Sequence, residues 1–481
     1  MKNQGNQTYQ INHGADNLCS RVFILQKSEL EKRFDPFYYV PELLELEKKV
    51  LAKKPKKLRD YVVSVSSGAT PKTTESELYY AEKENGIPFL RVQNLSPTGV
   101  LEFDDCKYIN EETHNGMLKR SQVSAGDLLV KITGVGRMAV ASVAPEGFIG
   151  NINQHVCVIK TGSKEISETL AAFLNSDIGE KLASRRSAGG TRPALDYPAL
   201  LSIPIIEDRR ILQITEKVID QKQKNEAEAE KLLSSIDDYL LKELGIKLPT
   251  PPENTLKNRM FISTIKSISG NRLDPFYHQV KFTETINSIN KSKYKKDLIQ
   301  HLIIELKNGI EVREYVEAGI RYLRVTDLTK NGINNKSPKF IASNNEIPDR
   351  IKLNTNCILV SRSGSLGLVN IVDDETINSI LSSHIFKLEL NTELVLPIYM
   401  EAFLRSTIGQ IQIFRNNNGG VIPEINQDAL KSIIVVVPPL DKQKEIAKHI
   451  TNIRQQAQQL KDKTKELLKK ASEEIEKILI G

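Results

Sequence analysis

The stretch from Leu440 to Ile480, LDKQKEIAKHITNIRQQAQQLKDKTKELLKKASEEIEKILI, contains neither glycine nor proline. Apolar or small residues recur along it in alternating steps of three and four, and only Thr464 interrupts the series. This spacing places one narrow apolar seam on a charged helix, which is typical of a coiled coil. Such a helix would be about 60 Å long, too long for one element of a compact domain. We therefore expect it to need a partner along the seam; the alternative is a solvated helix of a bundle.

A second run without glycine or proline, from Ile205 to Leu244, offers that partner. Its seam is apolar at both ends but polar in the middle, at Gln221, Asn225 and Glu228. Polar seam residues lower stability and tend to fix register and orientation. The residues predicted to join the two helices, or to bind a partner, are Ile211, Ile214, Val218 and Ile236 on the first and Ile446, Ile450, Ile453, Leu460 and Leu467 on the second.

The segments that precede these two helices repeat each other. Arg33-Phe34-Asp35-Pro36-Phe37-Tyr38 returns as Arg272-Leu273-Asp274-Pro275-Phe276-Tyr277, and Gly189-Gly190 before Pro193 returns as Gly419-Gly420 before Pro423. His155 likewise matches His384. An offset of about 230 to 240 residues indicates two similar halves, each a globular unit followed by a long helix, and not a solenoid. The halves should be related by approximate symmetry.

Between these landmarks the chain consists of short β-branched or apolar runs at 61–65, 87–92, 127–132, 140–143 and 156–159. One amphipathic helix is predicted near 167–183, and its counterpart near 396–413. This texture favours a mixed α+β fold with sheets of modest strands. The predicted organisation is an N-terminal arm with a short helix (1–57), a first globular domain (58–204), a central helix (205–245), a proline-rich linker (246–260), a second globular domain (261–439) and a C-terminal helix (440–481).

Composition sets loose limits on function. The formal charge of +7 permits binding to nucleic acid without establishing it. The four cysteines are far apart and show no metal or redox spacing, which favours reduced thiols in the cytoplasm. No segment approaches a membrane span, so we expect a soluble intracellular protein without a membrane partner.

Catalytic motifs are weak. The Asp-Pro-Phe-Tyr elements resemble the Asp-Pro-Pro-Tyr element of adenine methyltransferases, but they lack the second proline and no glycine-rich cofactor loop precedes them. We interpret them as turns that anchor the entry to each domain. Asp297 with Glu305-Leu306-Lys307 suggests a nuclease cluster, but serines stand at the matching positions of the first half. The sequence therefore predicts a non-enzyme without metal or cofactor, in which His155 and His384 are structural.

Basic and amide side chains in the loops suggest a DNA-binding surface instead. Arginine, lysine and asparagine contact phosphates and read guanine or adenine edges. Ordinary solvated loops are the alternative for any single residue. The predicted DNA contacts are Lys72, Lys131, Arg137, Arg185, Arg186 and Arg192 in the first half, and Arg313, Arg362, Arg415, Asn416 and Asn417 in the second.

Taken in order and in duplicate, several of these motifs make the chain resemble the specificity (S) subunit of type I restriction–modification systems. They include Ser67-Gly68-Ala69-Thr70-Pro71, Gly126-Asp127-Leu128-Leu129-Val130, Gly189-Gly190-Thr191-Arg192-Pro193 and Pro438-Pro439-Leu440-Asp441-Lys442-Gln443-Lys444-Glu445-Ile446. The resemblance runs from about Phe34 to the C-terminus. One departure is that no Thr-Pro follows Gly309 in the second half.

The resemblance implies two target recognition domains, each reading one half of a bipartite, asymmetric site on double-stranded DNA. It also implies that the two long helices pack as an antiparallel coiled coil, which spaces the domains and docks methyltransferase subunits and, through them, restriction subunits. Two other functions stay open: a DNA-binding or scaffold subunit of another phage-defence complex, and an orphan DNA methyltransferase or nuclease.

Overall fold

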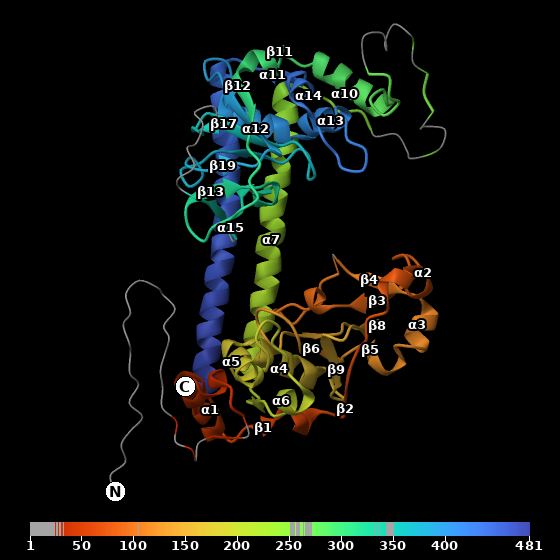
Figure 1. Cartoon of the computed structure of the whole chain (residues 1–481), viewed down its shortest axis with the longest axis vertical. Helices are drawn as coiled ribbons and strands as arrows, with labels where there is room; N and C mark the ends of the chain where they lie inside the picture. Colours follow the sequence, from red (N-terminus) through yellow and green to blue (C-terminus); the bar gives the residue numbers. More distant parts are fainter. Residues whose placement is uncertain are drawn as a thin grey trace, which may run out of the picture. The chain divides into compact units, whose positions relative to one another are not determined.

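The computed structural model describes residues 25, 27, 30, 31, 33–103, 105–250, 255, 260–262, 264, 272–330, 332–335, 337–342 and 351–481. The predictions for the first 24 residues and for most of the proline-rich linker concern residues outside these ranges. The chain forms two compact units of mixed α/β structure, which we call unit 1 (1–225 with 462–481) and unit 2 (226–461). Both long helices therefore contribute to both units (Figure 1). No helix in the described ranges has the length and apolar character needed to cross a membrane.

Unit 1 contains two four-stranded sheets, in the orders β2-β9-β6-β7 and β4-β3-β8-β5, and a small pair, β1-β10. All neighbours are antiparallel except β3 and β8, which run parallel. The strands are β1 (Lys56–Lys57), β2 (Ser64–Ser67), β3 (Ile87–Leu90), β4 (Lys107–Ile109), β5 (Gln122–Ser124), β6 (Leu128–Lys131), β7 (Ala141–Val143), β8 (Ile149–Ile152), β9 (Val156–Lys160) and β10 (Pro204–Ile205). The short helices of this unit are α1 (Pro41–Ala52), α2 (Ser76–Tyr79), α3 (Glu111–Asn115), α4 (Lys164–Asn175), α5 (Asp177–Arg186) and α6 (Tyr197–Leu201).

Unit 2 repeats this plan with sheets in the orders β12-β20-β17-β18 and β16-β13-β19 and the pairs β11-β21 and β14-β15. Its strands are β11 (Lys295–Leu298), β12 (Ile303–Asn308), β13 (Ile320–Leu323), β14 (Leu328–Thr329), β15 (Gly332–Ile333), β16 (Lys339–Ile341), β17 (Cys357–Ser361), β18 (Val369–Ile371), β19 (Ile380–Leu381), β20 (Ile385–Leu390) and β21 (Ile434–Val437). Its short helices are α10 (Val280–Asn290), α11 (Ile299–Leu302), α12 (Pro397–Arg405), α13 (Thr407–Arg415) and α14 (Gln427–Lys431).

The single amphipathic helix predicted in each half is wrong, because the structure has two helices in its place. Ser176 leaves the helical conformation and its hydroxyl accepts a hydrogen bond from the Gly179 amide, so α4 ends and α5 begins there. Ser406 caps α13 in the same way. A serine at the N-cap satisfies an amide that has no partner within the helix. A side chain at Gly179 would place its Cβ 2.1 Å from the Phe173 carbonyl oxygen, so glycine is required at this close approach.

The two predicted long helices are present as α7 (Arg209–Leu244) and α15 (Leu440–Ile480). Helix α7 begins four residues later than expected, because Ile205 belongs to β10 and pairs with Lys56. Within unit 1, the Asn225 side-chain amide of α7 donates to the Thr464 hydroxyl of α15 at 3.0 Å. Within unit 2, the rings of Tyr239 and His449 lie 3.9 Å apart.

The ends of both helices belong to the cores of the units. The core of unit 1 includes Ile211 of α7 together with Ile475 and Leu479 of α15. The core of unit 2 includes Leu240 of α7 and Ile446 of α15. Among the predicted seam residues, those buried are Ile211, Val218, Ile446, Ile450 and Ile453, and those partly buried are Ile214, Ile236, Leu460 and Leu467.

Candidate nucleic-acid interface

In unit 1, two loops are joined edge to edge beyond the end of strand β6. We call residues 132–139 and 187–195 the paired loops of unit 1. The Leu195 amide donates to the Ile132 carbonyl at 2.8 Å, and the Gly134 amide donates to the Pro193 carbonyl at 3.0 Å. Arg192 is exposed on the second loop. The repeated glycine-rich motif therefore forms a supported projection with a polar tip.

Unit 2 builds the same feature from residues 362–367 and 416–425, the paired loops of unit 2. The Ile425 amide donates to the Arg362 carbonyl at 2.9 Å, and the Gly364 amide donates to the Pro423 carbonyl at 3.1 Å. A Cβ at Gly419 would lie 1.9 Å from the Ile422 carbonyl oxygen, which explains the glycine. Because the same two backbone hydrogen bonds recur in both units, the repeat seen in the sequence is also a repeat of local structure here.

In each unit, the last residue of a strand forms hydrogen bonds with the first of the paired loops. This residue is Lys131 in unit 1 and Ser361 in unit 2. The Lys131 ammonium is buried and donates to the carbonyls of Val135 and Arg137 at 2.8 and 3.0 Å. The Ser361 hydroxyl donates to the Ser365 carbonyl at 2.5 Å. Burial lowers the pKa of Lys131. Lys131 thus shapes a loop, and its buried ammonium does not offer the exposed phosphate contact that the sequence suggested.

Arg185 and Arg186 are also buried, with only 3% and 8% of their surface exposed. Both guanidinium groups form ion pairs with Glu47 of α1, and burial lowers the pKa of each of them. A buried arginine is held by its ion pair and hydrogen bonds, so both side chains are occupied within the fold. We accordingly assign these two arginines to the packing of α5 against α1.

The repeated Asp-Pro-Phe-Tyr elements are anchoring turns in both units. Asp35 accepts hydrogen bonds from the Arg33 side chain at 2.8 Å and from the Tyr38 amide at 3.2 Å. The guanidinium of Arg185 lies 3.9 Å from the centre of the Tyr38 ring. That ring is buried and covered by a cation, so Tyr38 is held within the fold as part of the turn.

Unit 2 contains the same arrangement. Arg272 binds Asp274 at 2.7 Å, and the Tyr277 amide donates to Asp274 at 3.0 Å. Arg415 lies 3.9 Å from the centre of the Tyr277 ring and donates to the Tyr277 carbonyl at 3.1 Å. Arg415 is therefore the counterpart of Arg185 and serves to hold the turn.

The remaining predicted contacts differ in exposure. Arg137 and Arg362 are half-buried and pair with Asp177 and Glu424, and Asn416 and Asn417 are half-buried on the paired loops of unit 2. Lys72 and Arg313 are well exposed, lie outside the paired loops in the sequence, and pair with Glu75 and Glu311. The structure thus brings Lys131, Arg137 and Arg192 together in unit 1 and Arg362, Asn416 and Asn417 together in unit 2.

Lys72 and Arg313 occupy matching places. Lys72 lies four residues after Gly68, and Arg313 lies four residues after Gly309. A Cβ at Gly68 would lie 1.7 Å from the Ile152 carbonyl oxygen, and one at Gly309 would lie 2.0 Å from the Leu381 carbonyl oxygen. The shared close approach shows that the two loops begin alike, even though the second lacks the Thr-Pro of the first.

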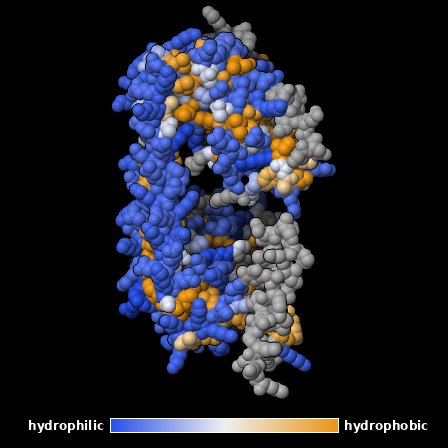
Figure 2. Space-filling view, turned by 90° about the vertical axis from the view of Figure 1, so that its left-hand side faces the viewer, coloured by the Kyte–Doolittle hydropathy of each residue, from blue (hydrophilic) through white to orange (hydrophobic). Residues whose placement is uncertain are grey.

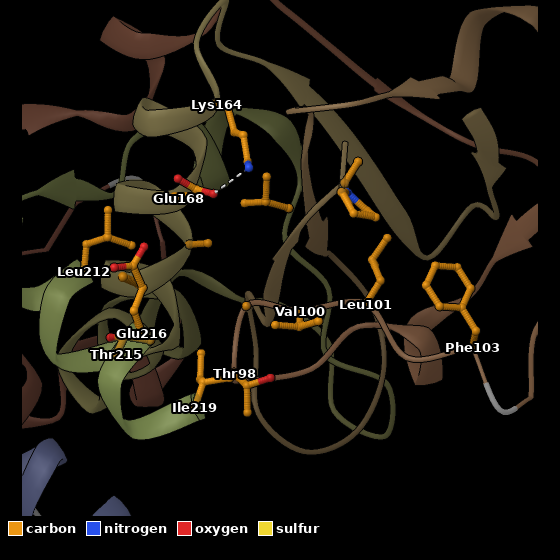
Figure 3. Close-up of a pocket in the computed structure, with 16 residues that line it drawn as sticks. Thr98, Val100, Leu101, Phe103, Lys164, Glu168, Leu212, Thr215, Glu216 and Ile219 are labelled. Carbon is orange, nitrogen blue, oxygen red and sulfur yellow. Dashed lines mark ion pairs between the residues drawn. The ribbon is translucent and has the colours of Figure 1, made fainter. Parts of the chain in front are cut away.

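A mainly apolar cavity of about 410 Å³ lies in unit 1 between the loop at 98–103, α4 and the first turns of α7 (Figure 3). Its polar side chains are Thr98, Thr215, Glu216 and the ion pair between Lys164 and Glu168 at 3.5 Å. The described residues contain no group of three or more His, Cys, Asp and Glu that could hold a metal ion. The lining is thus mainly apolar, with its charged groups on α4 and α7.

The corresponding place in unit 2 carries charges. Ala171 and Glu401 both lie five residues before the capping serine of their half. Ala171 lines the cavity of unit 1, whereas Glu401 is 2% exposed and binds Arg405 at 2.6 Å and Arg454 at 2.5 Å. The two halves thus share a backbone plan but differ in the side chains that occupy this place.

Comparison with known proteins identifies the domain in unit 2. Residues 311–470 match the family model of the type I restriction modification DNA specificity domain. This part of the chain is similar to that family. The family predicted from the sequence is therefore confirmed, and the paired loops of unit 2 lie inside the specificity domain. A search of curated proteins finds no match to the chain.

Solved structures show a distant likeness. An S subunit of a type I restriction-modification system from M. genitalium is 13% identical over 89% of this chain and 94% of its own, with a TM-score of 0.39. A chain from a structure on complex assembly and conformational transition of the type I R-M system is 14% identical over 88% of this chain and 96% of its own, with a TM-score of 0.43. The HsdS subunit from Thermoanaerobacter tengcongensis is 14% identical over 88% of this chain and 94% of its own, with a TM-score of 0.31. Because all three TM-scores are below 0.5, we draw nothing further from these likenesses.

Two features of the specificity domain and its repeat were missed in the sequence. The exposed apolar tip formed by Val421 and Ile422 received no role, although its place between the paired glycines and proline marks it as a loop tip. The partnership of Asn225 with Thr464 was also missed. Asn225 and Thr464 each interrupt the apolar seam of their own helix. An antiparallel alignment of the two helices places these two interruptions side by side.

Proposed function

We propose that the chain is the DNA sequence-specificity subunit of a type I restriction–modification complex and that it reads a bipartite, asymmetric site on double-stranded DNA. The match of residues 311–470 to a DNA specificity domain carries this proposal. The repetition of the paired loops and of the anchoring turns supports extending it to the first half. In this proposal the target recognition domains are residues 58–204 and 261–439, and the chain itself is not a catalyst.

The DNA contacts proposed are the accessible members of the predicted set. In unit 1 these are Arg137 and Arg192 on the paired loops and Lys72 on a separate loop. In unit 2 they are Arg362, Asn416, Asn417 and Arg313. Phosphate contacts orient a protein on the duplex, while base contacts carry the sequence information. Lys131, Arg185, Arg186 and Arg415 act indirectly here by holding loops and turns in place.

The two long helices are proposed to form an antiparallel coiled coil that spaces the two recognition domains, giving the chain an approximate twofold symmetry. Contacts within each unit support this direction, since the start of α7 packs with the end of α15 in unit 1 and the end of α7 lies beside the start of α15 in unit 2. Asn225 meets Thr464 in unit 1, and Glu243 meets Lys442 at 2.7 Å in unit 2. The same helices would offer the docking surface for methyltransferase subunits and, through them, restriction subunits.

The test is methylation mapping. The chain is co-expressed with a methyltransferase subunit of the same system in a host free of DNA methylation, and modified adenines are mapped across the genome. The expected result is a two-part motif with a fixed unread gap. Exchanging residues 58–204 for those of another specificity subunit should change one half of the motif and leave the other half intact. Modified adenines in the absence of the partner would show that the chain is itself an enzyme.

A further inference from the structure

A second cavity lies in unit 2, at the place that corresponds to the apolar cavity of unit 1. It has a volume of about 300 Å³ and is lined by residues of β15, β18, α12 and α15 and by Leu233 of α7. Charged side chains are common on the surface of the molecule (Figure 2), so the charges around this cavity do not mark a site by themselves. What distinguishes the cavity is an unfilled hydrogen-bond acceptor on a residue that lines it.

The acceptor belongs to Asn370 of β18, which is 2% exposed. The side-chain amide of Asn370 donates to the Thr329 carbonyl at 3.1 Å, but its Oδ1 has no hydrogen-bond partner among the described residues. Because the Thr329 carbonyl can only accept, the nitrogen must face it, and this fixes which side-chain atom is left over. Buried acceptors normally meet a donor, so Oδ1 calls for one that the fold does not supply. A single water would leave most of a cavity of this size unfilled.

Unit 1 shows that the fold does not require this open acceptor. Ser142 of β7 matches Asn370, because they pair with the corresponding leucines, Leu129 and Leu359, of the neighbouring strand. The Ser142 hydroxyl accepts a hydrogen bond from the Ser96 amide at 3.0 Å and donates to a carbonyl of the same loop at 3.1 Å. The same position is thus satisfied within unit 1 and left open in unit 2.

Helix α15 contributes cations to the cavity. Arg454 and Lys461 lie seven residues apart, about two helical turns, and share one face of the helix with the small Ala457 between them. One Arg454 nitrogen binds Glu401 at 2.5 Å. The other N–H groups of that guanidinium and the Lys461 ammonium have no partner among the described side chains. Arginine and lysine in this state are suited to bind an anionic group, and arginine can bind a carboxylate through two nitrogens.

The turn after β18 contributes the opposite charge. Asp373 lines the cavity three residues after Asn370. Its Oδ1 accepts hydrogen bonds from the Thr376 amide at 2.9 Å and the Thr376 hydroxyl at 2.6 Å, while Oδ2 has no partner among the described residues. An amide oxygen and a carboxylate oxygen are together suited to a positively charged donor such as an ammonium group.

The ligand that matches both sides carries an ammonium group and an acidic group. Two carboxylates, Glu401 and Asp373, line the same cavity and disfavour a multiply charged anion such as a phosphate monoester. A carboxylate with a single charge fits better. Ile333 and Ile371 supply apolar surface between the charged groups. These features together describe an amino acid with an apolar side chain.

We propose that this cavity of unit 2 binds one free amino acid with an apolar side chain. Its ammonium group donates to Asn370 and Asp373, and its carboxylate accepts from Arg454 and Lys461. This site goes beyond the proposed function in DNA recognition, and a negative result leaves that function as it stands.

The experiment is isothermal titration calorimetry on the full chain, with L-phenylalanine and L-leucine as probes. Two analogues separate the charged groups: 3-phenylpropionate lacks the ammonium group, and phenethylamine lacks the carboxylate. Each analogue should bind at least about tenfold more weakly than L-phenylalanine, because each loses one set of charge-assisted hydrogen bonds. Hydrogen exchange should slow on addition of L-phenylalanine in β18 and around residues 454–461, and stay unchanged in unit 1.

Two variants test the residues. Asn370→Ser installs the residue that unit 1 carries at this position, and Lys461→Met removes the ammonium group. Each should weaken binding of L-phenylalanine by about tenfold. Lys461→Met removes a side chain without a described partner, so it tests the site even if Asn370→Ser lowers the stability of unit 2. The matched control is Lys164→Met, which removes the cation from the cavity of unit 1 and should leave binding unchanged.

Several outcomes would overturn the proposal. They are the absence of binding by both amino acids at millimolar concentration, equal binding of either analogue, and wild-type affinity in Lys461→Met. Weaker binding in Lys164→Met, or slower exchange in unit 1 in place of unit 2, would likewise place the ligand elsewhere and overturn it.

Discussion

The polar pair inside the helix pair of unit 1 gives a quantitative prediction. Asn225 and Thr464 are 8% and 6% exposed, and the Asn225 amide donates to the Thr464 hydroxyl at 3.0 Å. Replacing Thr464 with valine keeps the shape but removes the acceptor, so a buried amide donor loses this partner. Such a loss costs about 1–3 kcal/mol. Backbone amides near residues 225 and 464 should then exchange with solvent about 5 to 150 times faster.

Hydrogen exchange followed by mass spectrometry measures this effect locally, which avoids treating a chain with two units as a two-state system. The double variant Asn225→Leu with Thr464→Val removes both polar groups, so its exchange should return toward that of the wild type. Gln221, which donates to the side-chain oxygen Oδ1 of Asn225 at 2.8 Å, is exposed and can bind water instead.

Thr451→Val is the matched control, because the Thr451 hydroxyl donates to the Ala447 carbonyl of its own helix. That change should leave exchange near Asn225 as it is. Unchanged exchange in Thr464→Val, or a double variant that exchanges as fast as the sum of the two single effects, would refute the assignment of this pair as a mutually satisfied polar contact.

Three further predictions concern charge. Glu47→Ala leaves Arg185 and its neighbour as buried cations, so the melting transition of unit 1 should fall by the equivalent of about 3–5 kcal/mol in calorimetry. Arg192→Ala should leave that transition unchanged but weaken DNA binding, and the slope of log affinity against log salt should fall by about 1 in anisotropy titrations. A hydrogen bond from His301 holds the pKa of Asp297 at about 2. The unfolded chain therefore binds more protons at Asp297 near pH 3, so the stability advantage of wild type over Asp297→Asn should be full above about pH 5 and vanish as the pH falls toward 2 in thermal melts.

The spacing of apolar residues predicted the two long helices. Helices α7 and α15 follow from the spacing of their apolar residues and from the absence of glycine and proline, which are local properties. The break at Ser176 was missed because apolar residues continue on both sides of it. The signal was present, since Ser176 and Ser406 are each followed three residues later by a glycine, Gly179 or Gly409.

The basic residues were harder to interpret because their environment comes from distant parts of the chain. Arg185 and Arg186 look like a surface pair in sequence, but Glu47, to which both bind, lies more than a hundred residues away. No local pattern separates an arginine that meets a phosphate from one that meets a buried carboxylate. Arg192 differs from them in standing between glycine and proline on a projecting loop, and it is the one that is exposed.

The loop tips give a reason to expect the two halves to read different sequences. Both tips rest on the same scaffold, with matching backbone hydrogen bonds beneath them. The tip in unit 1 is Thr191-Arg192, whereas the tip in unit 2 is Val421-Ile422, with exposures of 101% and 62%. Arginine and threonine can donate to phosphates or to base edges, while valine and isoleucine offer only apolar contact, such as with the methyl group of thymine. Under the proposed function, one scaffold presenting two different chemistries accounts for an asymmetric site without requiring two different folds.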